Sequence, residues 1–450
     1  MYVVRYDFVL GENITIPSKS VLEFEGGSIS GDGTGKDIIT GNNAGIQAGL
    51  VKIFNTNITL SGSWNVAEAY PEWFGAKGDS VTDDTNAIQR TLSYFTNCRL
   101  SKWYAISSTL IFNNNSHIIG NGVTNTSIIV LNNFSGDYIL YNNDNIAHFL
   151  ISGIYINASN VSVRGIYAKN PYDDCAIRDI HFDNFCKSAI YVGNDSSISQ
   201  SLVIDNCFVY MSAINPIVEE QMIANMVYEM NIKDSKFLYR QGAQGEYSCI
   251  RLNNCYDAYI RGNSFAFSKE YGIHFYGDCR YCRIIGNTYE DIVKGMLYLQ
   301  GLNYDDIQYF IVQETAYYNA SRTIKCENAV GIMSFGFSYI QGGRRCFSFN
   351  HPMNNPDGNV SIGIDGGQMN LGFVNISDLQ FGNPTYNYGL WANVSDSADY
   401  GLRIKRGTTD MIAYLPYGIV HYVDPILMTP NGTMRRLKIL DDGSVTSTPV

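Results

Sequence analysis

The chain repeats one short pattern of apolar and polar positions between residues 151 and 289. Each copy begins with isoleucine, has Gly, Asp or Asn at its third position and ends on an apolar residue at its sixth. The copies are 24 to 28 residues apart and begin at Ile151, Ile177, Ile204, Ile232, Ile260 and Ile284. A period of this length without a helix predicts one turn of a parallel β-helix, made of two or three short strands. We expect these isoleucines to stack in the interior and Asn and Ser side chains to form ladders at the turns.

The residues on either side of the repeats predict two smaller β units. Over residues 1–66, strand-like alternation is broken by glycine-rich turns, which predicts an N-terminal β unit. A further copy of the pattern at Ile376 extends the expected solenoid over residues 67–385. Residues 386–450 change to strand pairs with glycine turns, which is typical of antiparallel strands and a terminal hairpin.

One amphipathic helix is predicted near residues 83–95, just before the repeats. Its apolar positions recur at i, i+4 and i+7, at Ile88, Leu92 and Phe95. Thr82 or Asp83 can cap it, and the carboxylates of Asp83 and Asp84 suit its positive end. We therefore interpret this acidic pair as structural rather than catalytic. A lone amphipathic helix before a long β region is expected to cover the open end of the solenoid.

Composition and charge narrow the classes of partner. Of the 450 residues, 16% are charged and 45% are hydrophobic, which indicates an ordered protein with a large core. A net charge of −11 argues against nucleic acid or an anionic membrane as partner. The N-terminal stretch does not have the pattern of a signal peptide, and no apolar run reaches the roughly 18 residues of a membrane span.

The cysteines and other potential ligands give no clear cofactor signal. The ten cysteines are scattered, and Cys279 and Cys282 form a C-x-x-C that lacks a second pair. We expect free, buried thiols in a protein that folds in a cytoplasm. No zinc-like spacing, phosphate loop or Ser-His-Asp order stands out, so the sequence predicts neither a metal nor a cofactor.

A motif near the predicted helix resembles a known family. It comprises Trp73-Phe-Gly-Ala-Lys-Gly-Asp79, Thr82-Asp-Asp-Thr85 and Ala87-Ile-Gln89, followed by Trp103-Tyr-Ala-Ile106 and Gly120-Asn-Gly122. This set is similar to the start of pectate-lyase-like right-handed β-helix proteins, which include many phage tailspikes; the G-Y-x-I strand of the family lacks its usual Gly here. The resemblance implies an all-β, right-handed parallel β-helix with an N-terminal β unit, one capping α-helix and a C-terminal β unit. It does not fix the activity, because this superfamily contains lyases, hydrolases and pure binders.

The same resemblance implies a role in a virion tail. A phage tailspike or tail-fibre-like protein is made in the host cytoplasm, binds a bacterial surface or capsular polysaccharide and, in some cases, depolymerises it. Such a chain is expected to be a homotrimer that meets at its C-terminal unit and joins other virion tail proteins. Two alternatives remain open. One is a stand-alone bacterial polysaccharide lyase or glycoside hydrolase, against which the missing signal peptide argues. The other is a non-catalytic structural fibre or adhesin, which the missing catalytic motifs favour.

A second strand follows each isoleucine anchor and carries the candidate binding residues. With a period of two, one side chain per strand points outward on a common sheet. These outward residues are Tyr167, Tyr191, Arg251 and His274, and the turn after Tyr191 adds Asp195 as a further binding candidate. Aromatic faces beside carboxylates suit a sugar chain, because rings stack on sugar faces and carboxylates accept hydrogen bonds from hydroxyls.

The candidate catalytic residues are three carboxyls in turns next to this sheet, namely Glu219, Glu220 and Asp278. Glycosidic hydrolysis needs two carboxyls, about 5 Å apart for retention or about 6.5–9.5 Å apart for inversion. Strands about 4.8 Å apart permit both spacings. The alternative is that these acids are solvated turn residues. The polygalacturonase-like motif set is mostly absent, although Asp173-Asp174 and Arg403-Ile-Lys405 match parts of it.

Overall fold

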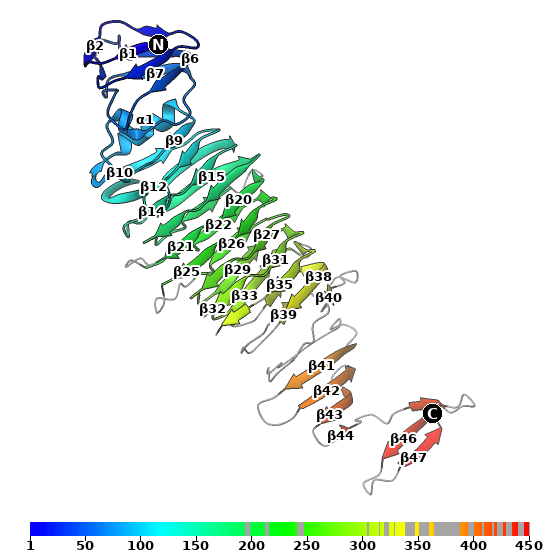
Figure 1. Ribbon diagram of the computed structural model, residues 1–450. Coiled ribbons are helices and arrows are strands. Elements are labelled where there is room, and N and C mark those ends of the chain that lie inside the picture. The colour runs from blue at the N-terminus through cyan, green and yellow to red at the C-terminus, as the bar shows by residue number, and fades with distance from the viewer. Residues whose placement is uncertain are drawn as a thin grey trace.

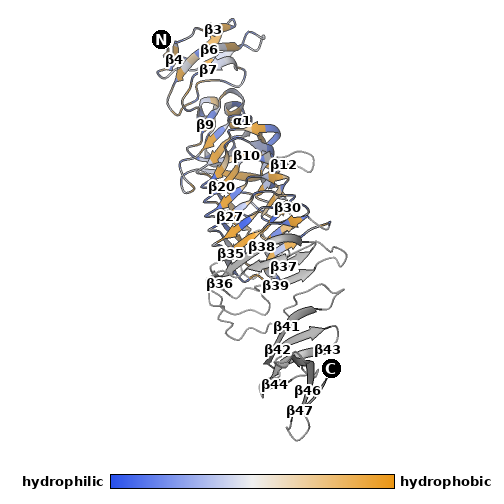
Figure 2. Ribbon diagram, turned by 90° about the vertical axis from the view of Figure 1, so that its right-hand side faces the viewer, coloured by the Kyte–Doolittle hydropathy of each residue, from blue (hydrophilic) through white to orange (hydrophobic). Residues whose placement is uncertain are grey.

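The computed structural model describes residues 1–193, 199–211, 216–240, 247–303 and 306–314, and beyond these the backbone of short strands up to residue 449. Within this part of the chain the fold is a parallel β-helix with one α-helix near its N-terminal end, as predicted (Figure 1). Hydrophobic residues gather on the strands of the solenoid (Figure 2). None of the described helices is long and apolar enough to cross a membrane.

The N-terminal unit is itself a small parallel coil. Its first turn comprises β1 (Tyr2–Val4), β2 (Phe8–Leu10) and β3 (Ile14–Ile16). Each strand pairs in parallel with one from the next turn, which comprises β4 (Val21–Phe24), β5 (Ile29–Gly31) and β6 (Ile38–Gln47). β7 (Thr59–Trp64) then pairs in parallel with β6. The fully buried side chains of Ile29, Ile39 and Phe54 fill the interior of this coil.

The helix α1 (Thr85–Tyr94) joins the N-terminal unit to the solenoid, as expected for a capping helix (Figure 1). Ile88 and Leu92 are buried on its inner face, and the Arg90 guanidinium lies 4.4 Å above the Phe74 ring. The Asp83 carboxylate accepts a 3.0 Å hydrogen bond from the Thr85 N–H at the start of the helix.

Asp84 has a different role from the predicted one. Its side chain makes no cap hydrogen bond, and its two oxygens accept the N–H groups of Lys77 and Gly78 at 2.7 and 2.9 Å. Asp84 therefore holds the Gly75–Gly78 turn closed. Its contacts, like those of Asp83, support the structural interpretation of the pair.

The isoleucine anchors stack as the repeat predicted. They lie on one parallel sheet, here called the anchor sheet, which includes β13 (Leu150–Ser152), β16 (Cys175–Arg178), β20 (Leu202–Asp205), β24 (Asn231–Lys233), β27 (Tyr259–Arg261), β31 (Arg283–Ile285) and β35 (Ile311–Glu314). Ile151, Ile177, Ile204, Ile232, Ile260 and Ile284 are paired in register from one turn to the next, and all are fully buried. This column forms one wall of the core.

A second sheet follows after a short turn in each rung. Its strands include β14 (Tyr155–Asn157), β17 (His181–Asp183), β21 (Phe208–Met211), β25 (Lys236–Tyr239), β28 (Ser264–Ala266) and β32 (Thr288–Glu290). The buried Phe265 ring stacks between Phe237 and Tyr289, with centroids 5.6 and 5.4 Å away. At the turn, the Ser235 N–H donates to Asn263 and the Asn263 N–H donates to Asn287, at 3.0 and 2.9 Å. These bonds confirm the predicted polar ladder.

A third sheet completes each rung and carries the candidate site, so it is called the ladder sheet. It includes β12 (Ser127–Ala147), β15 (Arg164–Tyr172), β18 (Ile190–Val192), β22 (Met222–Asn225), β26 (Ile250–Asn253), β29 (Tyr271–Tyr276) and β33 (Gly295–Gln300). Its inward column is apolar and fully buried, and consists of Leu140, Ile166, Ile190, Met222, Ile250, Ile273 and Leu297. The next residue along each of these strands therefore points outward.

Eight cysteines within the described residues are free and buried, as expected. Burial raises the pKa of the Cys207 and Cys255 thiols to about 12, so neither is a reactive thiolate near neutral pH. In the C-terminal region, β41 (Tyr388–Val394) pairs antiparallel with β42 (Tyr400–Arg406), and β46 (Met434–Ile439) pairs antiparallel with β47 (Val445–Pro449). The expected copy of the repeat at Ile376 lies outside the described residues.

Candidate functional site

One outward column runs along the ladder sheet, and we call it the outward strip. Register pairs its members from rung to rung as Tyr141, Tyr167, Tyr191, Ile223, Arg251, His274 and Tyr298. All four strand residues predicted to bind substrate lie in it. Neighbouring parallel strands are about 4.8 Å apart, so six steps give a strip roughly 29 Å long. Sequence alignment of the rungs missed Tyr141, Ile223 and Tyr298.

The N-terminal half of the strip is a cluster of stacked tyrosines. The Tyr167 ring lies 5.2 Å from Tyr141, 4.8 Å from Tyr138 and 5.7 Å from Tyr191, measured between ring centroids. Burial, followed by the neighbouring tyrosines, raises the pKa of Tyr167 to about 12. The hydroxyl group of Tyr167 therefore keeps its proton near neutral pH, and its ring is the centre of an aromatic surface.

Arg164 and Glu219 fix this cluster from one side. The Arg164 guanidinium lies 5.6 Å from the Tyr138 ring centroid and 5.4 Å from that of Tyr191. Two of its nitrogens contact the Glu219 carboxylate, one at 2.8 Å, and Ser188 donates both its N–H and its hydroxyl to the same carboxylate. Burial alone raises the pKa of Glu219, but these partners outweigh it and lower the pKa overall. Glu219 is thus an ionised group that positions Arg164.

Glu220 has the opposite electrostatic environment. Its residue is 8% exposed, and burial raises the pKa of its carboxyl, an effect increased by the charges of Glu219 and Glu270. The Arg251 Nη1 lies 3.8 Å from Oε1 and opposes this shift. In many hydrolytic sites a carboxyl with a raised pKa acts as the acid, and an ionised carboxylate beside it acts as the base or nucleophile.

The residues beside Glu220 add buried polar groups to this part of the strip. The side chain of Gln221 is fully buried, and neither its amide oxygen nor its amide nitrogen has a hydrogen-bond partner. The Tyr239 hydroxyl is also buried and donates to the Ser248 carbonyl at 2.9 Å. Both side chains lie in the interior beside Glu220, so they contribute to the buried environment of its carboxyl rather than to the surface of the strip.

The C-terminal half of the strip combines a cation with further rings. The Arg251 guanidinium lies 4.6 Å from the Tyr276 ring centroid, and its Nε donates to Asn253 at 2.9 Å. The His274 ring stacks on Tyr298 at 4.6 Å with an interplanar angle of 12°, and its Nε2 is 3.0 Å from the Gln300 amide oxygen. These contacts hold Arg251 and His274 in fixed orientations.

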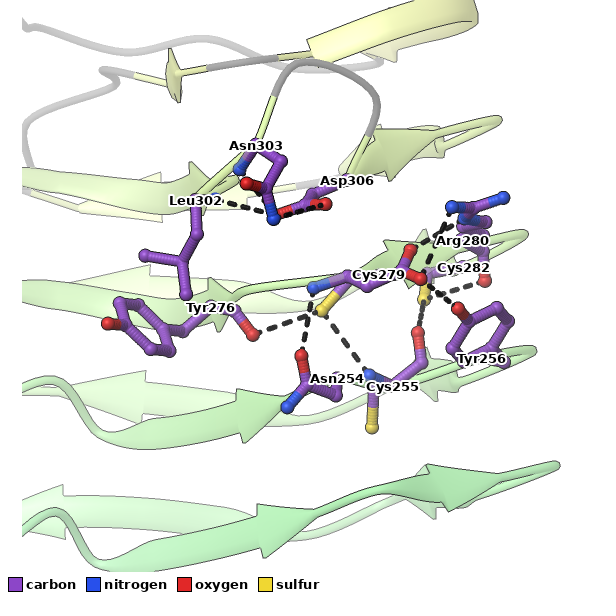
Figure 3. Close-up of polar contacts among 11 residues, drawn as sticks. Asn254, Cys255, Tyr256, Tyr276, Cys279, Arg280, Cys282, Leu302, Asn303 and Asp306 are labelled. Carbon is purple, nitrogen blue, oxygen red and sulfur yellow. Dashed lines mark hydrogen bonds and ion pairs between the residues drawn. The ribbon is translucent and has the colours of Figure 1, made fainter. Parts of the chain in front are cut away.

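Asp278 does not join this arrangement. It follows the far end of β29, whereas Glu220 precedes the start of β22, a difference of seven positions along the strand direction. At about 3.3 Å per residue the two carboxyls are roughly 20 Å apart, beyond the range of a catalytic pair. Asp278 instead pairs with the Arg280 Nε at 2.6 Å and accepts the Tyr256 hydroxyl. Figure 3 shows Arg280 and Tyr256 at this edge. The remaining candidate, Asp195, lies outside the described residues.

Sequence reasoning also missed Arg164 and Glu270. Glu270 precedes His274 by four residues, and Glu219 precedes Ile223 by four residues. Because Ile223 and His274 lie in the same column, a correct alignment of β22 would have shown that Glu270 corresponds to Glu219. Arg164 gave no local signal, because its partner is 55 residues away. In the part of the chain that the structure describes, no group of three or more His, Cys, Asp or Glu residues could hold a metal ion.

Comparisons with known proteins give distant structural similarities. No curated protein matches the chain. The tailspike protein 2 enzymatically active domain of bacteriophage CBA120 is 13% identical, with a TM-score of 0.43 over 86% of this chain and 70% of that chain. ORF18 of Geobacillus virus E2 is 13% identical, with a TM-score of 0.36 over 85% and 86%. PfbA, a surface adhesin of Streptococcus pneumoniae, is 12% identical, with a TM-score of 0.48 over 62% and 81%.

The family comparison concerns the start of the solenoid. Residues 72–166 match the model of a family described as rhamnogalacturonase A/epimerase, pectate lyase-like. This range contains the Trp73–Asp79 motif, the capping helix α1 and the first strands of the ladder sheet. Over residues 72–166 the chain therefore matches the pectate-lyase-like family that its motif resembles, and the parallel β-helix expected from that resemblance is the fold that it adopts.

Proposed function

We propose that this chain is a phage tailspike-like protein that binds a bacterial surface or capsular polysaccharide along the outward strip. The observation that carries the proposal is the column of aromatic and cationic side chains from Tyr141 to Tyr298, which Ile223 alone interrupts. Tyrosine rings offer flat apolar surfaces with a hydroxyl at one end, which suits the alternating apolar and hydroxylated faces of sugars. A strip roughly 29 Å long has room for an oligosaccharide segment.

The rigidity of the strip supports binding. Arg164 is held by Glu219 and Arg251 by Asn253, and the rings stack on one another. Side chains that are already fixed lose little conformational entropy when a ligand binds, so more of the contact energy becomes affinity. The entropy cost of binding therefore comes mainly from ordering the flexible glycan and not from ordering the side chains of the strip.

Cleavage of the bound glycan at Glu220 is the second part of the proposal. A raised pKa makes Glu220 suited to donate a proton to a leaving oxygen. Hydrolysis also needs a second carboxyl, and Glu270 is the candidate, because its charge acts on Glu220. The Glu270 carboxylate lies 2.5 Å from the Lys294 ammonium, which keeps it ionised and able to serve as the base. By contrast, the carboxylates of Glu219 and Asp278 form ion pairs with Arg164 and Arg280. These pairs favour the alternative, in which the chain binds the glycan without cleaving it.

The biological setting is inferred from the sequence motif and the family match. Both support a pectate-lyase-like solenoid. The motif resembles a family that includes many phage tailspikes, and on that resemblance we propose that the chain works as a homotrimer in a virion with other tail proteins. A stand-alone polysaccharide lyase or hydrolase uses the same fold, and a structural fibre or adhesin needs no active site. These alternatives differ in assembly and in turnover, and both properties can be measured.

The experiment is a panel of capsular polysaccharides and O-antigens tested against the purified chain. Binding is read by interferometry, and cleavage by new reducing ends and by the absorbance of unsaturated uronate. Arg251→Met removes the central cation of the strip and is expected to weaken the binding of any glycan that the wild type binds in this panel. The matched control is Arg261→Met, because Arg261 also stacks on a tyrosine but lies on the anchor sheet. Equal effects of both changes, or no binding across the panel, would contradict the proposal.

A further inference from the structure

A second surface with ligand-binding character lies at the edge where each rung enters the anchor sheet. One residue per rung occupies the same place in the turn before this sheet and has a left-handed backbone, and the N–H of each of the first four donates to a carbonyl of the next rung. This edge column consists of Ser201, Glu229, Asp257, Tyr281 and Tyr309. The edge lies on the same side as Tyr256 and Arg280 in Figure 3, away from the start of the ladder-sheet strands where Glu220 lies.

The two tyrosines of this column are unusual for their place. Both have a left-handed backbone, with φ of 60° at Tyr281 and 56° at Tyr309. Bulky residues rarely adopt this conformation, for which Asn, Asp and Gly are the common choices. Both side chains are also exposed, at 50% and 42%, so burial in the core does not explain them. A strained and exposed aromatic residue points to a role outside folding.

Their arrangement forms an aromatic platform. The rings are parallel, with an interplanar angle of 0° and centroids 5.0 Å apart. Arg283, two residues after Tyr281, is exposed on β31. Flat exposed rings with a hydrogen-bonding group beside them are suited to stack against the apolar face of a pyranose ring.

A hollow of ≈ 290 Å³ lies on earlier rungs of the same edge. Its floor is apolar and comes from Ala176 and Val203, while Ser201, Glu229 and Arg178 supply polar groups around it. Glu229 is fixed by a 3.1 Å hydrogen bond from the Ser201 hydroxyl. The amide oxygen of Asn231, which also lines the hollow, is buried and accepts no hydrogen bond. An apolar floor, fixed polar groups and an unused acceptor are suited to one polyhydroxylated ring.

We infer that this edge is a second carbohydrate-binding site, in which the hollow takes one sugar unit and the Tyr281–Tyr309 platform stacks against another. Glu229 and Tyr281 are two rungs apart, a separation of roughly 10 Å, so one short oligosaccharide can contact both. The site is independent of the outward strip, because it uses a different edge and different residues. A polysaccharide held at this edge would keep its neighbouring segment close to the outward strip, which raises the effective concentration of that segment at the strip.

The test uses saturation-transfer NMR on the full chain with four free sugars: D-glucose, D-galactose, L-rhamnose and N-acetyl-D-glucosamine. Tyr281→Asn removes the ring and places a residue that tolerates the left-handed backbone, and Glu229→Gln alters the hollow without changing its shape. For at least one sugar we expect the signal to fall roughly threefold to tenfold in both variants. The control is Tyr210→Ala on β21 of the second sheet, which should leave that signal unchanged, and Tyr191→Ala on the outward strip measures how much of the signal comes from the strip.

Three outcomes would overturn the inference. One is that none of the four sugars gives a signal. Another is that the signal is lost in Tyr191→Ala and kept in both edge variants, which would place all sugar binding on the strip. The last is a change in molar mass by light scattering in Tyr281→Asn with unchanged sugar signals, which would make the platform a contact between copies of the chain. Failure of the proposed function has a different signature, namely no effect of Arg251→Met on polysaccharide binding.

Discussion

Replacing Tyr191 by alanine tests the outward strip at the point where its contacts are best defined. The Tyr191 ring lies 5.7 Å from Tyr167 and 5.4 Å from the Arg164 guanidinium. An aromatic pair of this kind contributes about 0.5–1.5 kcal/mol, and a partly exposed cation–π contact contributes about 0.5–1 kcal/mol. We therefore expect the free energy of unfolding to fall by about 1–2 kcal/mol, which leaves the solenoid folded at room temperature.

The expected effect on binding is of similar size. Loss of one stacking surface is worth about 1 kcal/mol, or about a fivefold increase in Kd for the glycan found in the panel. Tyr191→Phe keeps the ring and should bind nearly as well as the wild type, because the hydroxyl group of Tyr191 is not needed for stacking. The measurements are interferometry for Kd and thermal melting at a fixed scan rate for stability.

The control for this experiment is Tyr210→Ala. Tyr210 is also an outward tyrosine stacked on a neighbour, with its ring centroid 6.1 Å from Phe208, but it lies on β21 of the second sheet. We expect a small loss of stability and no change in Kd. If Tyr210→Ala weakens binding as much as Tyr191→Ala, or if Tyr191→Ala binds as tightly as the wild type, the strip is not the binding surface.

Three further predictions concern charge, core and assembly. The pKa of Glu220 is higher in the folded chain than in the unfolded chain. Between these two pKa values the folded chain still holds a proton that the unfolded chain has lost, so the free energy of unfolding falls as the pH rises through this range. Glu220→Gln should therefore melt at a higher temperature than the wild type at neutral pH and reduce any cleavage, whereas an unchanged pH profile would contradict the assignment. Phe265→Ala, which opens a cavity between Phe237 and Tyr289, should lower the unfolding free energy in denaturant titrations by about 3–5 kcal/mol; a loss below about 1 kcal/mol would mean that the stack does not support the core. Light scattering should give three times 50.2 kDa, and a mass of one chain would favour the stand-alone enzyme.

The fold could be predicted because inward positions obey simple rules. Each rung needs an apolar side chain at the same place, so the isoleucine anchors recur and reveal both the period and the vertical stacking. The prediction was less complete where the pattern weakens. The segment between Met211 and Met222 does not resemble the other rungs, so β22 was misaligned and Ile223 was missed. In the N-terminal unit, strands of three residues contain too few alternations to distinguish parallel from antiparallel pairing.

The candidate site was harder to predict because its chemistry depends on contacts between rungs. The sequence predicts that Tyr167, Tyr191, Arg251 and His274 face outward, and the register places them in one column. It did not reveal that Asp278 is paired with Arg280 or that Glu219 is paired with Arg164. A carboxyl in a turn looks the same in sequence whether it is free or neutralised by an arginine, as Asp278 is by Arg280 two residues later and Glu219 is by Arg164 from another rung.

Glu219 and Glu220 illustrate how a solenoid separates neighbours in sequence. Glu219 and Glu220 lie in the turn before β22, with a bend at Glu219, and each side chain meets different partners. One carboxylate therefore meets Arg164 and Ser188, which lower its pKa, while the next is buried near Arg251, and burial raises its pKa. The partners that decide each charge come from rungs above and below, and the inward columns set the spacing of those rungs. Exchanging a residue at an outward position can therefore change the charge and the ligand of the surface while the stacked core, and with it the fold, stays the same.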